Sequence, residues 1–149
     1  MKNLFLLTLI SILMFSCETT VVEGVELGPA PGYLVAQDGS KIDARDADPS
    51  NLAIWEKYME AHNNKDFETI STMNHDSIVV NLYDGQNLFG SEAHLDLLKG
   101  YMEEFNPTFN TFFSYTMHVD GQVGDWVITG HQIDQTDNGE KQSLQDICD

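Results

Sequence analysis

Apolar and aromatic residues recur at helical spacing in the first two thirds of the chain. A helix is predicted from Asp48-Pro49 to about residue 63, since aspartate is a favoured N-cap and proline suits the first helical position. Its expected buried face carries Leu52, Trp55, Tyr58, Met59 and His62. A second, short helix is predicted after the cap Asp66, and a third after Ser91, up to about residue 105.

The pattern changes to strands between and after these helices. Ile78 to Tyr83 and Gln86 to Phe89 predict two short strands joined by Asp84-Gly85. Longer aromatic and β-branched runs predict strands over 109–119, 126–135 and 141–148, separated by the turn signals Asp120-Gly121 and Asp137-Asn138-Gly139. Helices that precede long antiparallel strands favour an α+β fold, with the helices on one face of a curved sheet.

The first residues read as a targeting segment. A short apolar run from Leu4 to Phe15 follows Lys2, and it is shorter than the roughly 20 residues that span a bilayer. Met14-Phe15-Ser16-Cys17 resembles a bacterial lipobox, so we expect a signal peptide over residues 1–17, acylation of Cys17 and a place in the bacterial cell envelope. An ordinary signal peptide that ends near Cys17 is the alternative.

Residues 18–48 show no lasting periodicity and contain Gly28-Pro29-Ala30-Pro31-Gly32, so we expect a tether there. A short strand and turn over 33–40, docked on the domain, is the alternative for its middle. The folded domain is then expected over residues 49–149.

Charge narrows the possible partners. The chain has 24 acidic and seven basic residues, for a net charge of −17. Such a field repels phosphate backbones, which excludes nucleic acid as a partner and leaves the acyl chains as the expected membrane contact. Cys148 is the one cysteine besides Cys17, so acylation of Cys17 would leave no intramolecular disulfide.

Several short motifs, in order, resemble the NTF2-like superfamily, in particular its SnoaL-like and ketosteroid-isomerase-like members. They are Trp55-x-x-Tyr58-x-x-Ala61-x-x-Asn64-Lys65-Asp66, Met73-x-x-Asp76-Ser77-Ile78, and Asp84-Gly85 followed by Phe89-Gly90-Ser91-Glu92-Ala93. The resemblance covers about residues 49–149 and implies a cone of three helices on a curved, mainly antiparallel sheet. It also implies a further long strand at the end of the sheet, whereas the given sequence stops at Asp149, so we expect the last strand to be missing through truncation. A domain that lacks one wall of its pocket is the alternative.

The resemblance also implies a site. In the isomerase branch a helix tyrosine and a late-strand acid donate to the substrate oxyanion, while a first-strand aspartate moves the proton. Tyr58 fits the first role, although a core tyrosine at the rim is the alternative. Asn81 falls at the base position and cannot accept a proton, and Cys148 falls at the acid position, with Asp146 two residues away. The strict isomerase mechanism therefore fails.

The five histidines lack the spacing of a metal site, and no nucleotide-binding fingerprint is present, so we expect no metal and no cofactor. We interpret His94 as a core histidine, whereas His118 and His131 lie on long strands whose buried face the pattern leaves open.

The sequence thus favours a pocket that binds a small hydrophobic molecule, without demonstrated catalysis, lined by Trp55, Tyr58, Asn81, Phe113, Tyr115 and Trp126. One alternative is a proton-transfer enzyme of isomerase, cyclase or dehydratase type, using Tyr58 with Asp146, His118 or His131. Another is a protein-interaction module that forms a homodimer through the outer face of the sheet.

Overall fold

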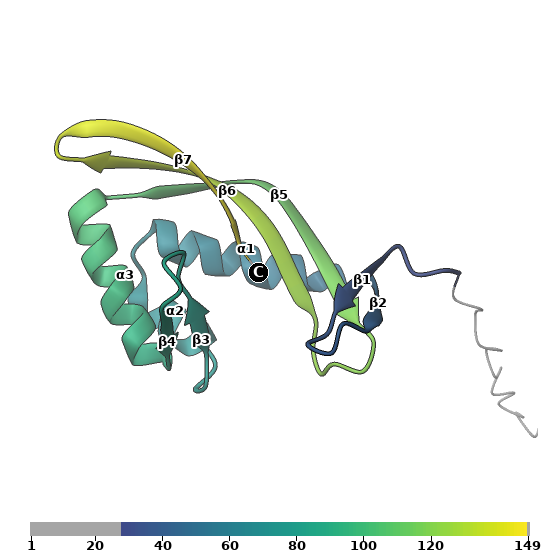
Figure 1. The fold of residues 1–149 in the computed structure, drawn as a ribbon. Coiled ribbons are helices and arrows are strands. Elements are labelled where there is room, and N and C mark those ends of the chain that lie inside the picture. Colours follow the sequence, from purple (N-terminus) through teal and green to yellow (C-terminus); the bar gives the residue numbers. More distant parts are fainter. Residues whose placement is uncertain (1–27, 149) are drawn as a thin grey trace, which may run out of the picture.

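A computed structural model of the protein describes residues 28–148 (Figure 1). The expected signal peptide, Cys17 and the first part of the expected tether lie outside these residues. The helices are α1 (Ser50–Asn63), α2 (Phe67–Met73) and α3 (Ser91–Phe105). The strands are β1 (Gly32–Val35), β2 (Lys41–Asp46), β3 (Val79–Asn81), β4 (Asn87–Phe89), β5 (Thr108–Val119), β6 (Trp126–Asp137) and β7 (Glu140–Cys148).

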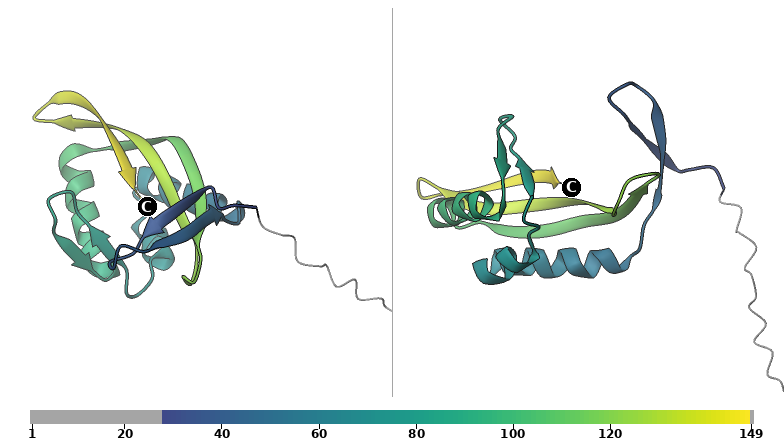
Figure 2. Two further views of the ribbon diagram at one scale, coloured as in Figure 1. Left: turned by 45° about the vertical axis from the view of Figure 1, so that its right-hand side comes forward. Right: turned by 90° about the horizontal axis from the view of Figure 1, so that it is seen from below.

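The strands form one large sheet and one small hairpin. The large sheet has the order β1-β2-β5-β6-β7 and is antiparallel throughout, while β3 and β4 pair only with each other. The long strands β5 and β6 curl around α1 and α3, as Figures 1 and 2 show. The predicted α+β class is confirmed, and three helices lie against a strongly curled antiparallel sheet, the arrangement that the resemblance to the NTF2-like superfamily implies.

Two of the three predicted cap residues accept a hydrogen bond from the start of their helix, although Pro49 and not Asp48 occupies the N-cap position of α1. The Asp48 carboxylate accepts a hydrogen bond from the Ser50 amide at 2.8 Å, and the Asp66 carboxylate accepts from the Thr69 amide at 3.0 Å. The prediction that Ser91 caps α3 is wrong. Gly90, with φ of 87°, precedes the helix, and the Ser91 hydroxyl accepts a hydrogen bond from the side chain of Asn74 instead.

The ordered sheet begins earlier in the chain than Pro49. Residues 32–46, which we assigned to the tether, form a β-hairpin, and its second strand pairs with β5. Ala44 lies opposite Val119 in that ladder, and both are buried. Pairing with β5 gives this weakly patterned segment hydrogen-bond partners that sequence periodicity does not reveal.

A β-bulge in β5 decides which side chains reach the helices. The register with β6 shifts between Thr111, opposite His131, and Phe113, opposite Gly130. Because neighbouring residues of β6 point to opposite faces, Thr111 shares the concave face with His131, while Phe113 shares the convex face with Gly130. The concave face packs on the helices and the convex face points away from them.

The convex face carries exposed apolar side chains. Those with the largest exposed fractions on β5 and β7 are Phe112 (54%), Tyr115 (40%), Phe113 (38%) and Ile147 (68%). The expected homodimer through the sheet stays a prediction, and this surface would carry it. β7 is the edge strand beyond β6, where the expected further strand would pair.

The space between the helices and the sheet is part apolar and part polar. The apolar core consists of Ala61, Ile70, Leu98 and Met102, with Tyr58, Phe67, Leu95 and Phe109 packed against it. The buried polar side chains are His62, His94, Thr116, Thr129, His131 and Gln135. A polar group removed from water needs a hydrogen-bond partner, so this second set identifies where a site can be sought.

Candidate functional site

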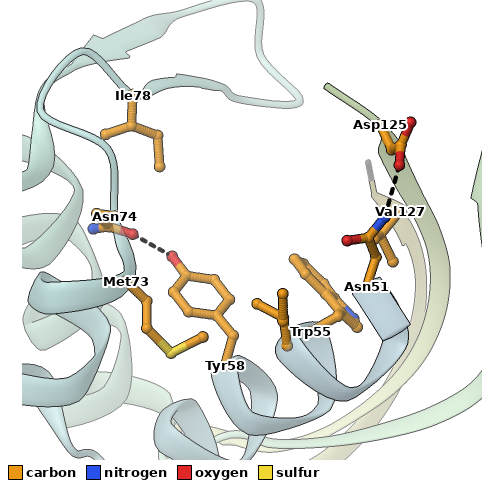
Figure 3. A pocket seen from close by; sticks show the side chains of 9 residues that line it. Asn51, Trp55, Tyr58, Met73, Asn74, Ile78, Asp125 and Val127 are labelled. Carbon is orange, nitrogen blue, oxygen red and sulfur yellow. Dashed lines mark hydrogen bonds between the residues drawn. The ribbon is translucent and has the colours of Figure 1, made fainter. Parts of the chain in front are cut away.

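A pocket of about 290 Å³ lies between α1, the end of α2 and the start of β6. Its lining consists of Asn51, Ile54, Trp55, Tyr58, Met73, Asn74, Ile78, Asp125 and Val127. Figure 3 shows Ile78 and Asp125 on opposite sides of the pocket, with Trp55 and Tyr58 from α1 beneath them. The volume is close to the lower end of the range for small-molecule sites, and most of the lining is apolar.

Two of the six expected lining residues are present. Trp55 and Tyr58 line the pocket, whereas Asn81, Phe113, Tyr115 and Trp126 do not. The bulge in β5 turns Phe113 and Tyr115 to the convex face, and Trp126 shares that face because it lies opposite Met117. Asn81 is exposed and pairs with Asn87 in the β3–β4 hairpin, away from the lining.

Seven lining residues were missed by the sequence analysis. Asn51 and Ile54 precede Trp55 and Tyr58 at helical spacing, so extending the predicted face of the helix would have found them. The remaining five come from the end of α2, the segment after it and the start of β6, namely Met73, Asn74, Ile78, Asp125 and Val127. Nothing in the local sequence distinguishes these, because folding alone brings them to α1.

The side chain of Asn74 joins three parts of the site. Its Oδ1 accepts a hydrogen bond of 2.6 Å from the Tyr58 hydroxyl, and its Nδ2 donates to Ser91 Oγ at 3.0 Å. The same Nδ2 lies 3.1 Å from His94 Nδ1. An amide nitrogen only donates, so His94 Nδ1 accepts and the ring proton is on Nε2. Burial raises the pKa of Tyr58 to about 12, so its phenol stays protonated and remains a donor.

His62 lies beside this group with the opposite tautomer. Its Nδ1 is 2.7 Å from the carbonyl oxygen of Tyr58, and a carbonyl only accepts, so Nδ1 carries the proton. Its ring meets that of Tyr58 edge-on, with centroids 4.4 Å apart, and lies 6.1 Å from the ring of His94. Desolvation lowers the pKa of both histidines, and both are therefore neutral at pH 7.

Three of the four candidate catalytic residues share the concave side of the sheet. His131 is 2% exposed, with its ring 6.1 Å from that of Trp55, which in turn lies 5.6 Å from Tyr58. Asp146 on β7 lies directly opposite His131, so both side chains point to the same face. The fourth candidate, His118, lies near the end of β5, where its Nδ1 is 2.9 Å from Asp125.

Within residues 28–148, no group of three or more His, Cys, Asp or Glu side chains has the geometry of a metal site. The buried histidines are instead held by single hydrogen bonds to Tyr58, Asn74 and Thr111.

The chain is similar in structure to two SnoaL-like polyketide cyclases. One, from Shewanella denitrificans OS-217, is 17% identical with a TM-score of 0.42, and the match covers 66% of this chain and 92% of that one. The other, from Shewanella putrefaciens CN-32, is also 17% identical with a TM-score of 0.42, over 67% of this chain and 80% of that one. No protein-family model and no curated protein matches the chain.

We expect the buried histidines to make the stability of the protein depend on pH. Desolvation lowers the pKa of His62, His94 and His131 in the folded protein below the usual 6.5. The unfolded chain therefore binds more protons just below that pH, so their contribution is complete above pH 6.5 and is lost as pH falls towards the folded-state values. Urea unfolding from pH 7.5 to 5.0 measures the slope.

A histidine variant separates this effect from the titration of the many carboxylates. His131→Asn should make the fall in unfolding free energy with decreasing pH shallower than in the wild type. The same substitution at His75, which is exposed and bonded only to nearby Ser77, should leave the slope unchanged. Identical slopes in all three proteins would contradict the expectation.

Proposed function

We propose that this SnoaL-like, NTF2-like domain protein binds a small, largely apolar molecule in the pocket of Trp55 and Tyr58, and that it is exported and lipid-anchored. The pocket itself carries the binding proposal. It combines an apolar surface from Ile54, Met73, Ile78 and Val127 with the polar side chains of Tyr58 and Asn74. A few polar groups in an apolar concavity are typical of small-molecule sites.

Binding is tested with ethylbenzene as a minimal apolar probe, titrated into the full-length chain and followed by NMR. We expect saturable shifts at pocket residues, and we expect Trp55→Ala to weaken the affinity about tenfold or more, because an aromatic wall contributes a large contact area. Trp126→Ala is the matched control, since Trp126 lies on the convex face and its indole donates to Gln122 at 2.8 Å. Equal losses in the two variants, or no saturable binding, would exclude this pocket.

The anchor is supported by the sequence alone, through the apolar run that ends in Ser16-Cys17. None of the helices within residues 28–148 is long and apolar enough to cross a membrane. We expect protein expressed with its own first 17 residues to partition into detergent and to carry the added mass of acyl chains. Cys17→Ser should abolish both, while a wild-type chain with an unmodified Cys17 would contradict the proposal.

Proton transfer is the second candidate function, favoured by the position of Asp146 opposite His131 on the concave face. A carboxylate beside an imidazole is a common arrangement for moving protons. Exchange of the methyl protons of acetophenone for deuterium distinguishes this candidate from binding alone. Catalysis requires exchange faster with the wild type than with His131→Phe.

A further inference from the structure

Two pairs of polar side chains line the pocket. In the first pair, the Tyr58 hydroxyl gives its single proton to Asn74 Oδ1 at 2.6 Å. In the second pair, the Asn51 amide nitrogen donates to Asp125 Oδ2 at 2.9 Å. Figure 3 shows the second pair on the Trp55 side of the pocket, across from Asn74. The donors of the first pair are all occupied within the protein, so the second pair is the more open to a ligand.

The second pair offers only acceptors to the pocket. A carboxylate only accepts, so the bond to Asp125 turns the amide nitrogen of Asn51 towards it and leaves Oδ1 on the other side. Figure 3 shows that oxygen on the pocket side of Asn51, and no donor within residues 28–148 bonds to it. Each Asp125 oxygen accepts one hydrogen bond, from Asn51 and from His118 Nδ1, and keeps a free lone pair. A ligand group at this place must therefore donate.

Charge decides which kind of donor fits best. Among the described residues that line the pocket, Asp125 is the one with a charged side chain, and that side chain is 27% exposed. On the neighbouring strand β2, Arg45 forms its own ion pair with Asp43 at 3.1 Å. The positive end of α1 lies close by, but the Asp48 carboxylate accepts from its first turn and offsets it. With a net charge of −17 on the chain, this end of the pocket attracts cations and repels anions.

An aromatic wall lies beside the carboxylate. The rings of Trp55 and Tyr58 have centroids 5.6 Å apart and are tilted by 44°. The face of an aromatic ring attracts a cation, and indole does so most strongly. Figure 3 shows Trp55 between Tyr58 and Asn51, with Met73 and Ile78 on the far side. A molecule with a charged donor at one end and an apolar body matches this order of surfaces.

We propose that the pocket binds an organic ammonium cation, with its nitrogen at Asp125 and Asn51 and its apolar body along Trp55 towards Met73. This inference rests on the proposed binding function and adds the chemical class of the ligand, a protonated primary or secondary amine with an apolar skeleton. Asp125 determines the specificity, because an alcohol of the same shape donates one hydrogen bond and carries no charge.

Three probes of equal size test the ligand class. Ethylbenzene, benzyl alcohol and benzylamine differ only in a terminal methyl, hydroxyl or ammonium group. With the full-length chain at pH 7.5 and low salt, we expect benzylamine to bind about tenfold more tightly than benzyl alcohol, since hydrogen bonds between charged groups are the stronger ones. Benzoate, which has the opposite charge, should bind more weakly than benzyl alcohol. The side-chain amide protons of Asn51, bonded to Asp125, should shift with benzylamine and much less with benzyl alcohol.

A charge-removing variant then assigns the effect. Asp125→Asn keeps the shape of the side chain, so it should erase most of the preference for benzylamine over benzyl alcohol and leave ethylbenzene binding nearly intact. Asp120→Asn is the matched control, since it removes the same charge from the same connection between β5 and β6. Asp120 is exposed and lies outside the pocket lining, so this control measures the general attraction of cations to an acidic protein. If Asp125→Asn does not fold, the wild-type shifts of the Asn51 amide decide.

The outcomes separate the two proposals. If ethylbenzene binds and benzylamine gains nothing over benzyl alcohol, the ammonium site is wrong and the pocket stands. The site is also wrong if Asp120→Asn lowers the preference as much as Asp125→Asn, or if benzylamine binds without moving the Asn51 amide protons. If no probe binds, the binding function fails together with the ammonium site.

Discussion

Replacing Asn74 with leucine is expected to lower the free energy of unfolding by about 2–5 kcal/mol, because each buried polar partner left unpaired costs about 1–3 kcal/mol. The substitution removes the acceptor of the Tyr58 hydroxyl and the donor to His94 Nδ1, and it also frees the Ser91 hydroxyl. Leucine has the same number of side-chain heavy atoms and the same branch point as asparagine, so it keeps the shape of the side chain and removes its hydrogen bonds. Urea unfolding at pH 7.5 measures the loss.

Two further variants test whether the loss at Asn74 comes from its hydrogen bonds, one as a control and one as a rescue. Asn51→Leu makes the same change in the same pocket, but Asn51 bonds to Asp125 in an exposed position, so we expect a loss below about 1 kcal/mol. Adding Tyr58→Phe to Asn74→Leu should restore about 1 kcal/mol, since the orphaned hydroxyl disappears. If Asn74→Leu costs no more than Asn51→Leu, the hydrogen-bond network does not stabilise the fold.

Ile70→Ala is expected to cost about 2–5 kcal/mol, the usual range for truncating a fully buried aliphatic side chain. Ile70 is 0% exposed and belongs to the cluster of Ala61, Leu98 and Met102, which joins α1, α2 and α3. The cavity left at this junction of three helices can collapse only if a helix moves, and that places the cost towards the upper part of the range.

The matched control for this substitution is Ile54→Ala. Ile54 also lies in a helix but is 59% exposed, and alanine favours the helix, so little or no loss of stability is expected. Chemical unfolding of both variants beside the wild type gives the comparison. A loss at Ile70 as small as that at Ile54 would mean that the three helices do not depend on this contact.

The fold class and most element boundaries followed from local signals. Helical spacing of apolar residues located α1 and α3, and the cap Asp66 located α2, because a side-chain cap is a contact between residues three apart in sequence. The turn Asp137-Asn138-Gly139 placed the β6–β7 connection, where Asn138 and Gly139 adopt positive φ angles. Such signals need no knowledge of distant residues.

The candidate site was predicted only in part, because local sequence patterns indicate which residues share a face of one element and not which elements meet. Trp55 and Tyr58 were found because they share one face of a helix, and the periodicity of a helix fixes that face. Phe113 and Tyr115 were misplaced because a single extra residue in β5 reverses the faces of everything after it. No local sequence pattern identifies Asn74 as a site residue, since its hydrogen-bond partners Tyr58, Ser91 and His94 are 16 to 20 residues away in sequence.

The sequence by itself determined the α+β class, the three helices, the succession of β3 to β7 along the chain and the aromatic face of α1. Each depends on spacing or capping within a few residues, where the covalent chain already limits the geometry. Only the tertiary structure decided that β2 pairs with β5 and that His131 and Asp146 share the concave face. It also decided that the Tyr58 hydroxyl donates its hydrogen bond to Asn74. These contacts depend on strand register and helix packing, which are set by the burial of the whole core and by no local pattern.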